Sequence, residues 1–520
     1  MVTDIDVLIV GGGINGLTAA AYLARSGRSV LIVEQAATCG GVASGTRPFA
    51  GIDVDVSPFA AGLTMPPSRI CRDLKLDCAT TAMTTTTFIP VPGSASGGVL
   101  LTGDALHNLA ELESAGLGHD SDGMRAVRDD REMWAGAVTG LLTEPLLRRT
   151  ELRAGIAPAL WESFVESPLA NILRLNLSSD LLRGAFLAPA LAADHTYADD
   201  PTLAQNRAFL SGAVTQSEGQ VAPAGGGPEL VRSLYRAAVS AGAQVMTEAS
   251  VRRIQPVRDA PVRVTYRVSG ETRELTAHRV LATVPRWVLD DLLGEAHEGE
   301  RPESAAASAS VLIRRLPRIS GSTPPELAFG GTFLANASGE LLDDARRQSG
   351  EGLIPVTLPC LIRVPTLADR RLLPPALRHS GAHLMHITAL GLPYSLGERL
   401  PPELFRERVQ SGIMRSLASV FDDSVEDLVL PDALGMPCVR TWTSVDVEND
   451  FGYPGGHLQQ SRLAWPFVDE QEALSTPAER WGVNTRHDRV FVAGGSVRRA
   501  ESGTGLAGFA AAMAVCEADA

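Results

Sequence analysis

Lysine is nearly absent from this chain, and aromatic residues are scarce. Lys75 is the one lysine among 46 basic residues, so almost every cationic side chain is an arginine. Phe, Trp and Tyr together form 5% of the sequence. Acidic residues number 60, which gives a formal net charge of -14 at pH 7. A chain of this charge repels phosphate backbones, and we therefore expect no nucleic-acid partner.

Clustered cysteines and long apolar runs are also missing. The six cysteines are scattered, and no two have the C-x-x-C spacing of zinc sites or thioredoxin-like motifs. We expect reduced thiols and no metal site. No stretch approaches the roughly 20 apolar residues of a membrane-spanning helix, and Met1–Asp6 does not resemble a secretory signal. We therefore expect a cytoplasmic protein without a transmembrane segment, and leave peripheral contact with a membrane surface open.

What the sequence does contain is ample material for a large hydrophobic core. It has 520 residues, of which 45% are hydrophobic and 20% are charged. A chain of this length is expected to form two to four domains and needs no disulfides to stabilise its core. Fifty residues are glycine, more than the average share, and many of them stand in recognisable motifs.

The first forty residues follow the pattern of a dinucleotide-binding βαβ unit. Ile5–Val10 is short, continuous and rich in β-branched residues, as in a buried parallel strand. It leads directly into a G-x-G-x-x-G motif at Gly11–Gly16. Leu17–Ser26 has helical composition, and a second buried strand, Val30–Val33, ends at Glu34. The complete unit is far more specific than a glycine motif alone.

Each part of the glycine motif has a physical role. Gly11 permits the tight turn, Gly13 lets a pyrophosphate approach the backbone, and Gly16 lets the helix pack closely on the sheet. Unpaired N–H groups where the helix begins, at Ile14 and Asn15, attract phosphate. These residues are therefore candidate cofactor ligands.

The residues after the second strand distinguish between cofactors. Glu34 can accept hydrogen bonds from ribose hydroxyls, and its charge argues against the 2′-phosphate of NADP. Cys39–Ser44, with a pair of glycines, follows a few positions later. The segment Gly11–Gly41 resembles the amine-oxidase and phytoene-desaturase superfamily of FAD enzymes. This resemblance implies non-covalent FAD, with contacts from Gln35, Gly40, Gly41 and Val42.

The middle of the chain also resembles this superfamily. Glu218–Gly227 is similar to the superfamily's Pro-x-Gly-Gly turn, and a helix is predicted at Pro228–Ser240. Strands are predicted at Ala243–Val245 and Ala249–Ile254. In the superfamily the residue matching Val251 contacts adenine through its backbone; the alternative is an ordinary core residue.

An antiparallel ribbon follows. Val262–Val268 and Glu274–Thr283 alternate between apolar and polar residues, which indicates paired strands. The second of them continues as a buried strand to Pro285. It matches the strand at which this superfamily leaves its FAD domain.

The C-terminus resembles the superfamily's last motif. Arg489–Ala493 is predicted to be a buried strand, followed by a glycine-rich loop and an apolar helix that runs to about Cys516. Gly494, Gly505 and Gly508 match the pattern. The resemblance implies that the start of this helix faces the pyrimidine end of the flavin, where its dipole stabilises negative charge.

One stretch departs from that pattern. Desaturase-like members commonly carry a His-Pro-Gly-Gly-Gly run where this chain has Arg498-Arg499-Ala500-Glu501-Ser502. One hypothesis is that Arg498 or Arg499 binds a substrate carboxylate or stabilises anionic reduced flavin, which would make them catalytic candidates. The alternative is that both arginines turn outward or bind the FAD phosphate.

The resemblance implies an α/β fold with two interleaved parts. A Rossmann-type FAD-binding domain is expected from three separated segments, and an α+β substrate-binding domain from the rest. The expected FAD-binding segments are 1–75, 220–300 and 480–520, and the expected substrate-binding segments are 76–219 and 301–479.

Composition gives a coarse expectation for the substrate-binding part. Residues 104–185 are expected to be helical, with breaks near Gly116–Gly123 and Pro145. Leu181–Ala193 is apolar and is expected to lie in the core, with a wall of the substrate site as the alternative. Residues 300–350 are polar and glycine-rich, and loops are expected there.

The expected activity is that of a phytoene-desaturase-like dehydrogenase. A hydride would pass from a C–C or C–N bond of a fairly apolar small molecule to flavin N5, and the electrons would pass to oxygen or another acceptor. The alternatives are a redox-neutral isomerase or cyclase, an amine oxidase, and a non-enzymatic binding protein of the same fold.

Two observations bear on these alternatives. Many amine oxidases of the superfamily have a lysine near flavin N5, and no lysine follows Lys75 here, which weakens the amine-oxidase alternative. The sequence does not single out a general base among the histidines and tyrosines of the substrate-binding part. The candidates are His195, Tyr197, His383, His386 and His457.

Overall fold

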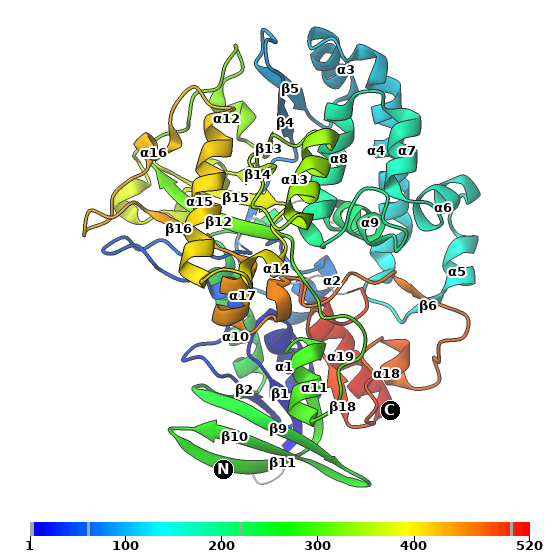
Figure 1. Ribbon diagram of the computed structural model, residues 1–520. Coiled ribbons are helices and arrows are strands. Elements are labelled where there is room, and N and C mark those ends of the chain that lie inside the picture. Colours follow the sequence, from blue (N-terminus) through cyan, green and yellow to red (C-terminus); the bar gives the residue numbers. More distant parts are fainter. Residues whose placement is uncertain (1–4, 60–62, 218–220, 500–502, 520) are drawn as a thin grey trace.

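The structure is a computed structural model that describes residues 5–59, 63–217, 221–499 and 503–519. A twisted sheet with flanking helices forms the lower part in Figure 1, and a second sheet and a group of helices lie above it. Three hydrophobic cores correspond to these three parts. The predicted α/β architecture is confirmed.

The lower sheet is assembled from segments far apart in the sequence. Its strands run in the order β8-β2-β1-β11-β10-β9, and β18 pairs with β11. Strands β8, β2, β1, β11 and β18 pair in parallel, and β11, β10 and β9 pair antiparallel. The predicted antiparallel ribbon corresponds to β10 and β11. The bounds are β1 Ile5–Val10, β2 Val30–Val33, β8 Gln244–Met246, β9 Ala249–Val257, β10 Ala260–Val268, β11 Glu271–Ala282 and β18 Val490–Val492.

Three helices pack together beside this sheet. The first helix, α1 (Ile14–Arg25), contacts both α10 (Gly227–Ser240) and α19 (Leu506–Ala518). Alanine and glycine dominate the facing surfaces of α1 and α19, so their backbones approach closely. A fourth helix, α11 (Arg286–Leu293), contacts β9. The chain beginning, middle and end therefore meet around α1.

The second sheet has the strand order β16-β12-β15-β14-β13-β4-β5. One face packs on α15 (Pro402–Ala418) through residues such as Phe405 and Ile413. The expectation of loops at 300–350 was wrong, since two strands and two helices, α12 (Pro325–Ala328) and α13 (Gly339–Gly350), lie there. The first five residues of β12 are alanine and serine, and the strand pairs with β15 on one side and β16 on the other. The bounds are β4 Thr87–Pro90, β5 Gly98–Leu101, β12 Ala306–Ile313, β13 Thr332–Ala335, β14 Cys360–Arg363, β15 His383–Leu390 and β16 Val439–Trp442.

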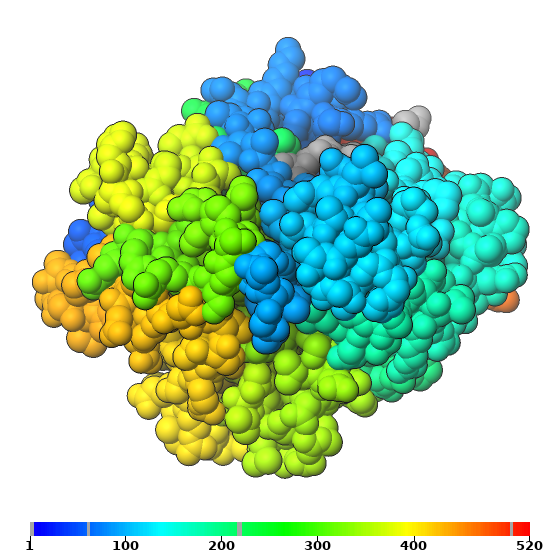
Figure 2. Space-filling model, turned by 90° about the horizontal axis from the view of Figure 1, so that it is seen from above, coloured from blue at the N-terminus to red at the C-terminus, as the bar shows by residue number. Residues whose placement is uncertain are grey.

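The third part is helical, as predicted, and its first two helices are separated between residues 114 and 121. Trp134, Trp161, Phe164 and Phe209 contribute to its core, where the last two rings stack at 5.8 Å. Seen from above, this part lies beside the second sheet and its helices (Figure 2). The bounds are α3 Ala105–Ser114, α4 Ser121–Val138, α5 Arg149–Ala154, α6 Pro158–Val165, α7 Leu169–Asn176, α8 Asp180–Ala193 and α9 Ala204–Ser217.

Three further observations concern sites and cysteines. All six cysteines are free. Among the described residues, no group of three or more His, Cys, Asp or Glu side chains could hold a metal ion. None of the helices in the described ranges combines the length and apolarity needed to span a bilayer.

Candidate functional site

The turn from β1 to α1 exposes bare backbone. A Cβ atom on Gly16 would lie 2.1 Å from the carbonyl oxygen of Gly11, so only glycine allows this contact between helix and turn. A Cβ atom on Gly13, in contrast, would meet nothing within 4 Å. Gly13 also precedes α1 without a side-chain cap. The first N–H groups of α1, from Ile14 onward, therefore adjoin open space, as a bound pyrophosphate requires.

Glu34 connects this turn to the end of β2. Its Oε2 accepts a hydrogen bond from the Gly12 N–H at 2.7 Å, and its Oε1 accepts one from the Ala36 N–H at 2.8 Å. The side chain is 7% exposed, whereas the neighbouring Gln35 is exposed. Glu34 thus shapes the glycine turn itself, a role that the sequence did not indicate. A carboxylate has enough lone pairs to accept a ribose hydroxyl as well.

The second glycine pair lies against the first motif. Gly40 forms a parallel bridge with Gly13, and its N–H donates to the Gly12 carbonyl at 2.9 Å. Gly41 begins a 3-10 turn, Gly41–Ser44, that includes Val42. A Cβ atom on Gly41 would lie 3.8 Å from the Cα atom of Gly13. The two motifs form one continuous surface of backbone, which we call the glycine strip (residues 11–16 and 40–45).

The remaining predicted cofactor residues surround this strip. Ala249, on the same strand as Val251, donates its N–H to the Glu34 carbonyl at 2.9 Å, which places β9 beside the end of β2. Val251 is itself buried. Gly505 precedes α19, and a Cβ atom on Gly508 would lie 1.9 Å from the Asn15 carbonyl oxygen.

Gly494 and Gly495 form a third glycine segment, which follows β18. A Cβ atom on Gly494 would lie 2.4 Å from the Thr283 carbonyl oxygen, so this turn packs against the end of β11. The neighbouring Gly495 donates its N–H to Gln460 Oε1 at 2.8 Å. Asn15 Oδ1, at the start of α1, is buried without a hydrogen-bond partner among the described residues. An open backbone, an uncapped helix and an unsatisfied buried acceptor fit a dinucleotide such as FAD.

A cavity of about 1300 Å³ begins where the glycine strip ends. Ala43, Ser44 and Gly45 line it together with Gly225–Gly227, and it extends between the second sheet and the helical part. One wall is apolar and belongs to α8 and α9. Leu181–Ala193 therefore does more than form core, because part of α8 faces this cavity. The apolar lining residues of these helices include Leu182, Ala185, Phe186, Pro189 and Phe209.

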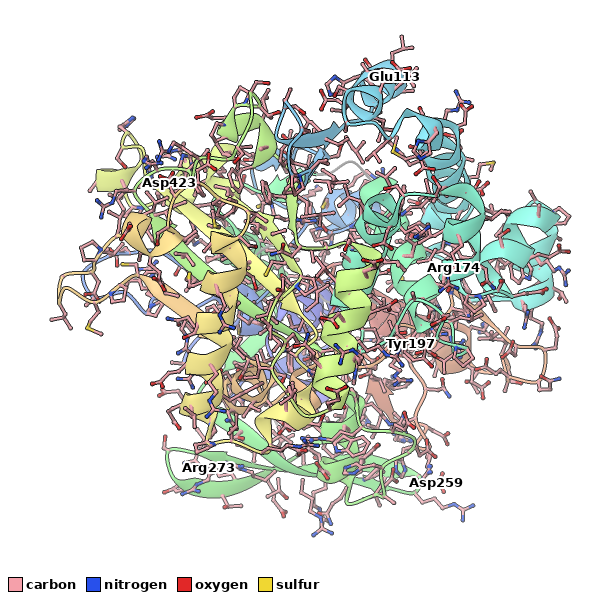
Figure 3. All side chains as sticks on the ribbon, turned by 45° about the horizontal axis from the view of Figure 1, so that its top comes forward. Glu113, Arg174, Tyr197, Asp259, Arg273 and Asp423 are labelled. Carbon is pink, nitrogen blue, oxygen red and sulfur yellow. The ribbon has the colours of Figure 1, made fainter. Side chains whose placement is uncertain are left out.

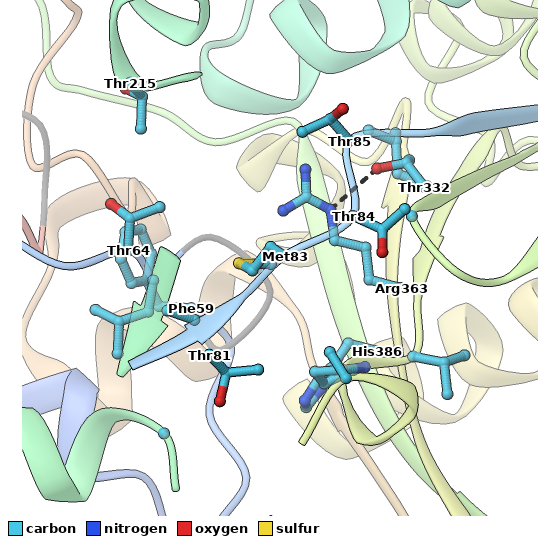
Figure 4. A pocket seen from close by; sticks show the side chains of 18 of the residues that line it. Phe59, Thr64, Thr81, Met83, Thr84, Thr85, Thr215, Thr332, Arg363 and His386 are labelled. Carbon is cyan, nitrogen blue, oxygen red and sulfur yellow. Dashed lines mark hydrogen bonds between the residues drawn. The ribbon is translucent and has the colours of Figure 1, made fainter. Parts of the chain in front are cut away.

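The opposite wall is the second sheet, where a polar row crosses three strands. Thr332, Arg363 and His386 are register partners on β13, β14 and β15, so their side chains project from the same face. Arg363 Nε donates to Thr332 Oγ1 at 3.1 Å, as the dashed line in Figure 4 shows. His386 Nδ1 lies 2.8 Å from Ser310 Oγ. All three residues of the row line the cavity.

His386 is the one base candidate that lines this cavity within the described residues. Burial lowers the pKa of His386 to about 4, so its imidazole is neutral at pH 7. His383 hydrogen-bonds Thr366 Oγ1 at 3.1 Å, and burial, aided by Arg370, lowers the pKa of His383 to about 4. Tyr197 is covered by Arg346, whose guanidinium carbon is 3.8 Å from the ring centroid.

Two other candidates take part in structural contacts. His195 lies 3.5 Å from the Glu303 carboxylate and its side chain is 40% exposed. His457 Nε2 lies 3.3 Å from Asp194 Oδ1, and both side chains are almost completely buried. Asp194 follows α8, while His457 belongs to the segment that contains Gln460. This pair therefore links the cavity wall to the region of Gly494 and Gly495.

The two candidate arginines of the last loop point to other partners. Arg498 donates to the Phe467 carbonyl at 2.6 Å and to Glu472 Oε2 at 2.7 Å. Arg499 donates to the carbonyls of Leu141 and Glu144. Neither lines the large cavity. Ala500, Glu501 and Ser502 lie outside the described residues.

Arg363 was missed by the sequence analysis, although a weak signal existed. It lies on the apolar strand β14, on the same face as Leu361, and a lone arginine is unusual in such a strand. Arg131 of the polar helix α4 was missed as well; it also lines the cavity, and its guanidinium carbon lies 4.8 Å from the Phe209 ring centroid. Only the pairing of strands and helices shows that both face one space.

Comparison with known proteins agrees with this architecture. Residues 9–69 match the NAD(P)-binding Rossmann-like domain family. The uncharacterized protein Rv0897c of Mycobacterium tuberculosis is 34% identical over 98% of this chain and 97% of its own length. A solved structure of putrescine oxidase with bound putrescine has a TM-score of 0.56 at 14% identity, covering 99% of this chain and 98% of that one.

A second solved structure has the same fold. Cyclohexylamine oxidase from Brevibacterium oxydans gives a TM-score of 0.54 at 14% identity, and the match covers 99% of both chains. At this identity the likeness concerns the fold alone. The chain belongs to the same family as Rv0897c, and it shares its fold with putrescine oxidase and cyclohexylamine oxidase.

Proposed function

We propose that this protein is an FAD-dependent oxidoreductase that removes a hydride from a C–C or C–N bond of a fairly apolar small molecule. The observation that carries this proposal is the continuity of the glycine strip with a large, partly apolar cavity. A dinucleotide on the strip would have its reactive end at the cavity mouth, near Ala43 and Gly225.

Each part of the site has a task in this proposal. The open backbone at Gly13 and the start of α1 bind the pyrophosphate, and Glu34 holds the ribose. The α8–α9 wall binds the apolar body of the substrate and excludes water. FAD supplies the hydride acceptor. Segments 1–75, 220–300 and 480–520 form the FAD-binding domain, and segments 76–219 and 301–479 form the substrate-binding domain.

The polar row supplies a proton acceptor, which the reaction needs in addition to a hydride acceptor. Loss of a hydride from a C–H bond on one carbon of a C–C unit would leave a carbocation, which becomes an alkene when a proton departs from the neighbouring carbon. His386 is neutral at pH 7 and faces the cavity, so it is placed to accept that proton. The fixed contact between Nδ1 and Ser310 orients the ring, which directs the other nitrogen away from Ser310.

The absorption spectrum of the purified protein tests the cofactor. We expect flavin bands that pass into the supernatant after acid precipitation, because nothing in the proposal tethers FAD covalently. Gly13→Ala should lower the flavin content, since the added methyl enters the space of the pyrophosphate. Gly350→Ala is the matched control, because its Cβ atom also meets nothing within 4 Å.

The outcome separates the alternatives. A colourless protein that does not take up added FAD would refute the proposal and favour a binding protein. If FAD is present but product and substrate have equal mass, the reaction is redox-neutral. A mass difference of two hydrogens supports dehydrogenation.

A further inference from the structure

We propose that the cavity binds a substrate with a carboxylate at one end of an apolar body, and that Arg363 binds this carboxylate. This inference rests on the proposed function and names the class of substrate that the enzyme would take. It concerns an anion site on the second sheet, on the far side of the cavity from the apolar helices.

The formal charge of the cavity is opposite to that of the whole protein. Among the described residues, seven arginines and five acidic residues line it, while the chain as a whole has a net charge of -14. Three of the arginines pair with acids of the lining: Arg47 with Asp55, Arg232 with Glu229, and Arg371 with Asp369. The lining therefore has a cationic surplus, which attracts an anion.

Arg363 is the arginine best placed to use this surplus. It ends β14 in the middle of the second sheet, and the register pairs it with Thr332 on one side and His386 on the other. The hydrogen bond from Nε to Thr332 Oγ1 fixes the plane of the guanidinium. A fixed, planar guanidinium suits the two oxygens of a carboxylate better than a mobile lysine does.

The burial of Arg363 favours the binding of an anionic ligand. Burial lowers the pKa of Arg363, which means that the protein interior opposes its charge. A bound carboxylate would offset this cost. The neighbouring His386 stays neutral at pH 7 and adds no second charge, so the row offers a single positive charge and matches a monoanion rather than a phosphate dianion.

The rest of the cavity fits an apolar body. On the helical wall, the cavity is lined by Leu182, Phe186, Pro189 and Phe209. Threonines of the segment before β4 line it as well (Figure 4). The same cationic surplus repels a protonated amine. This argues against the amines bound by the proteins of similar fold and for an acid.

The test compares three probes of one chain length: octanoate, octan-1-ol and octylamine. Binding to the flavin-containing protein is measured by calorimetry and by the shift of its flavin absorption. We expect octanoate to bind at least tenfold more tightly than octanol, and octylamine more weakly than either. Arg363→Gln should lower the affinity for octanoate to that for octanol and leave octanol unchanged, while Arg363→Lys should retain part of the preference.

Two variants serve as controls. Arg273→Gln changes an exposed arginine at the end of the β10–β11 ribbon, remote from the cavity (Figure 3), and should leave all three affinities unchanged. Arg131→Gln removes the other deep arginine of the cavity. If it abolishes the octanoate preference while Arg363→Gln keeps it, the assignment to Arg363 is wrong.

Other outcomes are equally decisive. Equal affinity for octanoate and octanol in the unaltered protein would overturn the anion site, even if Arg363→Gln fails to fold. Failure of the proposed function looks different: calorimetry would still detect the octanoate preference in a protein that holds no flavin. Tighter binding of octyl phosphate than of octanoate would show that the site takes a dianion and would refute the monoanion assignment.

Discussion

The glycine strip and the cavity are built in different ways. Backbone atoms form the strip, and its contacts leave no space for a side chain at Gly16, or at Gly508 of α19, which packs against Asn15 of the strip. Side chains from distant elements form the cavity, and they meet only because strands and helices pack together. A cofactor site of the first kind depends on fold, while a substrate site of the second kind can change its chemistry without changing the fold.

The largest expected effect tests the backbone contacts of the first region. In Gly508→Ala the new methyl group would lie 1.9 Å from the Asn15 carbonyl oxygen, so α19 must move away from α1. We expect a loss of about 3 kcal/mol or more in the free energy of unfolding, measured by denaturant titration, together with the loss of bound flavin. A variant with normal stability would show that the two helices are not held by this contact.

The next prediction concerns the buried pair that links the two regions. His457→Ala leaves the Asp194 carboxylate buried next to a void, and Asp194 Oδ2 is already without a partner among the described residues. We expect a destabilisation of about 3 kcal/mol. His457→Gln, which can still donate a hydrogen bond, should recover part of it. Equal stability of both variants would contradict a role for the hydrogen bond.

The third prediction uses the pH dependence of the cavity wall. The pKa of His386 is about 4 in the folded protein and near 6.5 when unfolded, so the unfolded chain takes up the proton first as the pH falls. The contribution of His386 to the free energy of unfolding is fully present above pH 6.5. It falls by about 3 kcal/mol as the pH falls from 6.5 to 4. Unfolding titrations of His386→Gln should show a pH dependence that is flatter by this amount. Identical profiles for variant and unaltered protein would refute it.

The two regions also differ in how far the sequence predicts them. Gly11, Gly13, Gly16 and Glu34 lie within one short segment, where the spacing of glycines reports the backbone conformation directly. The βαβ unit was predicted for this reason, and the antiparallel ribbon was predicted from the local alternation of apolar and polar residues. The order of the strands in the second sheet was not, because it depends on pairing between segments separated by many residues.

The cavity shows the same limit for side chains. Arg363 and His386 are neighbours across two strands, but nothing local in the sequence relates them. Arg498 and Arg499 were conspicuous only because they interrupt a familiar motif. Their partners, Phe467, Glu472 and the carbonyls near residue 142, belong to segments that no spacing rule connects with the last loop.

The smallest expected effect is that of Arg498→Ala, which tests whether an arginine that interrupts a motif also belongs to the substrate site. Arg498 is bound to Glu472 by a partly exposed ion pair, in which the side chains are 26% and 42% exposed. Such pairs contribute about 1 kcal/mol or less, so Arg498→Ala should lower the free energy of unfolding by no more than this amount. Because the side chain does not line the large cavity, the affinity for octanoate should stay the same, in contrast to Arg363→Gln. A tenfold loss of octanoate binding in Arg498→Ala would instead return the carboxylate site to the last loop.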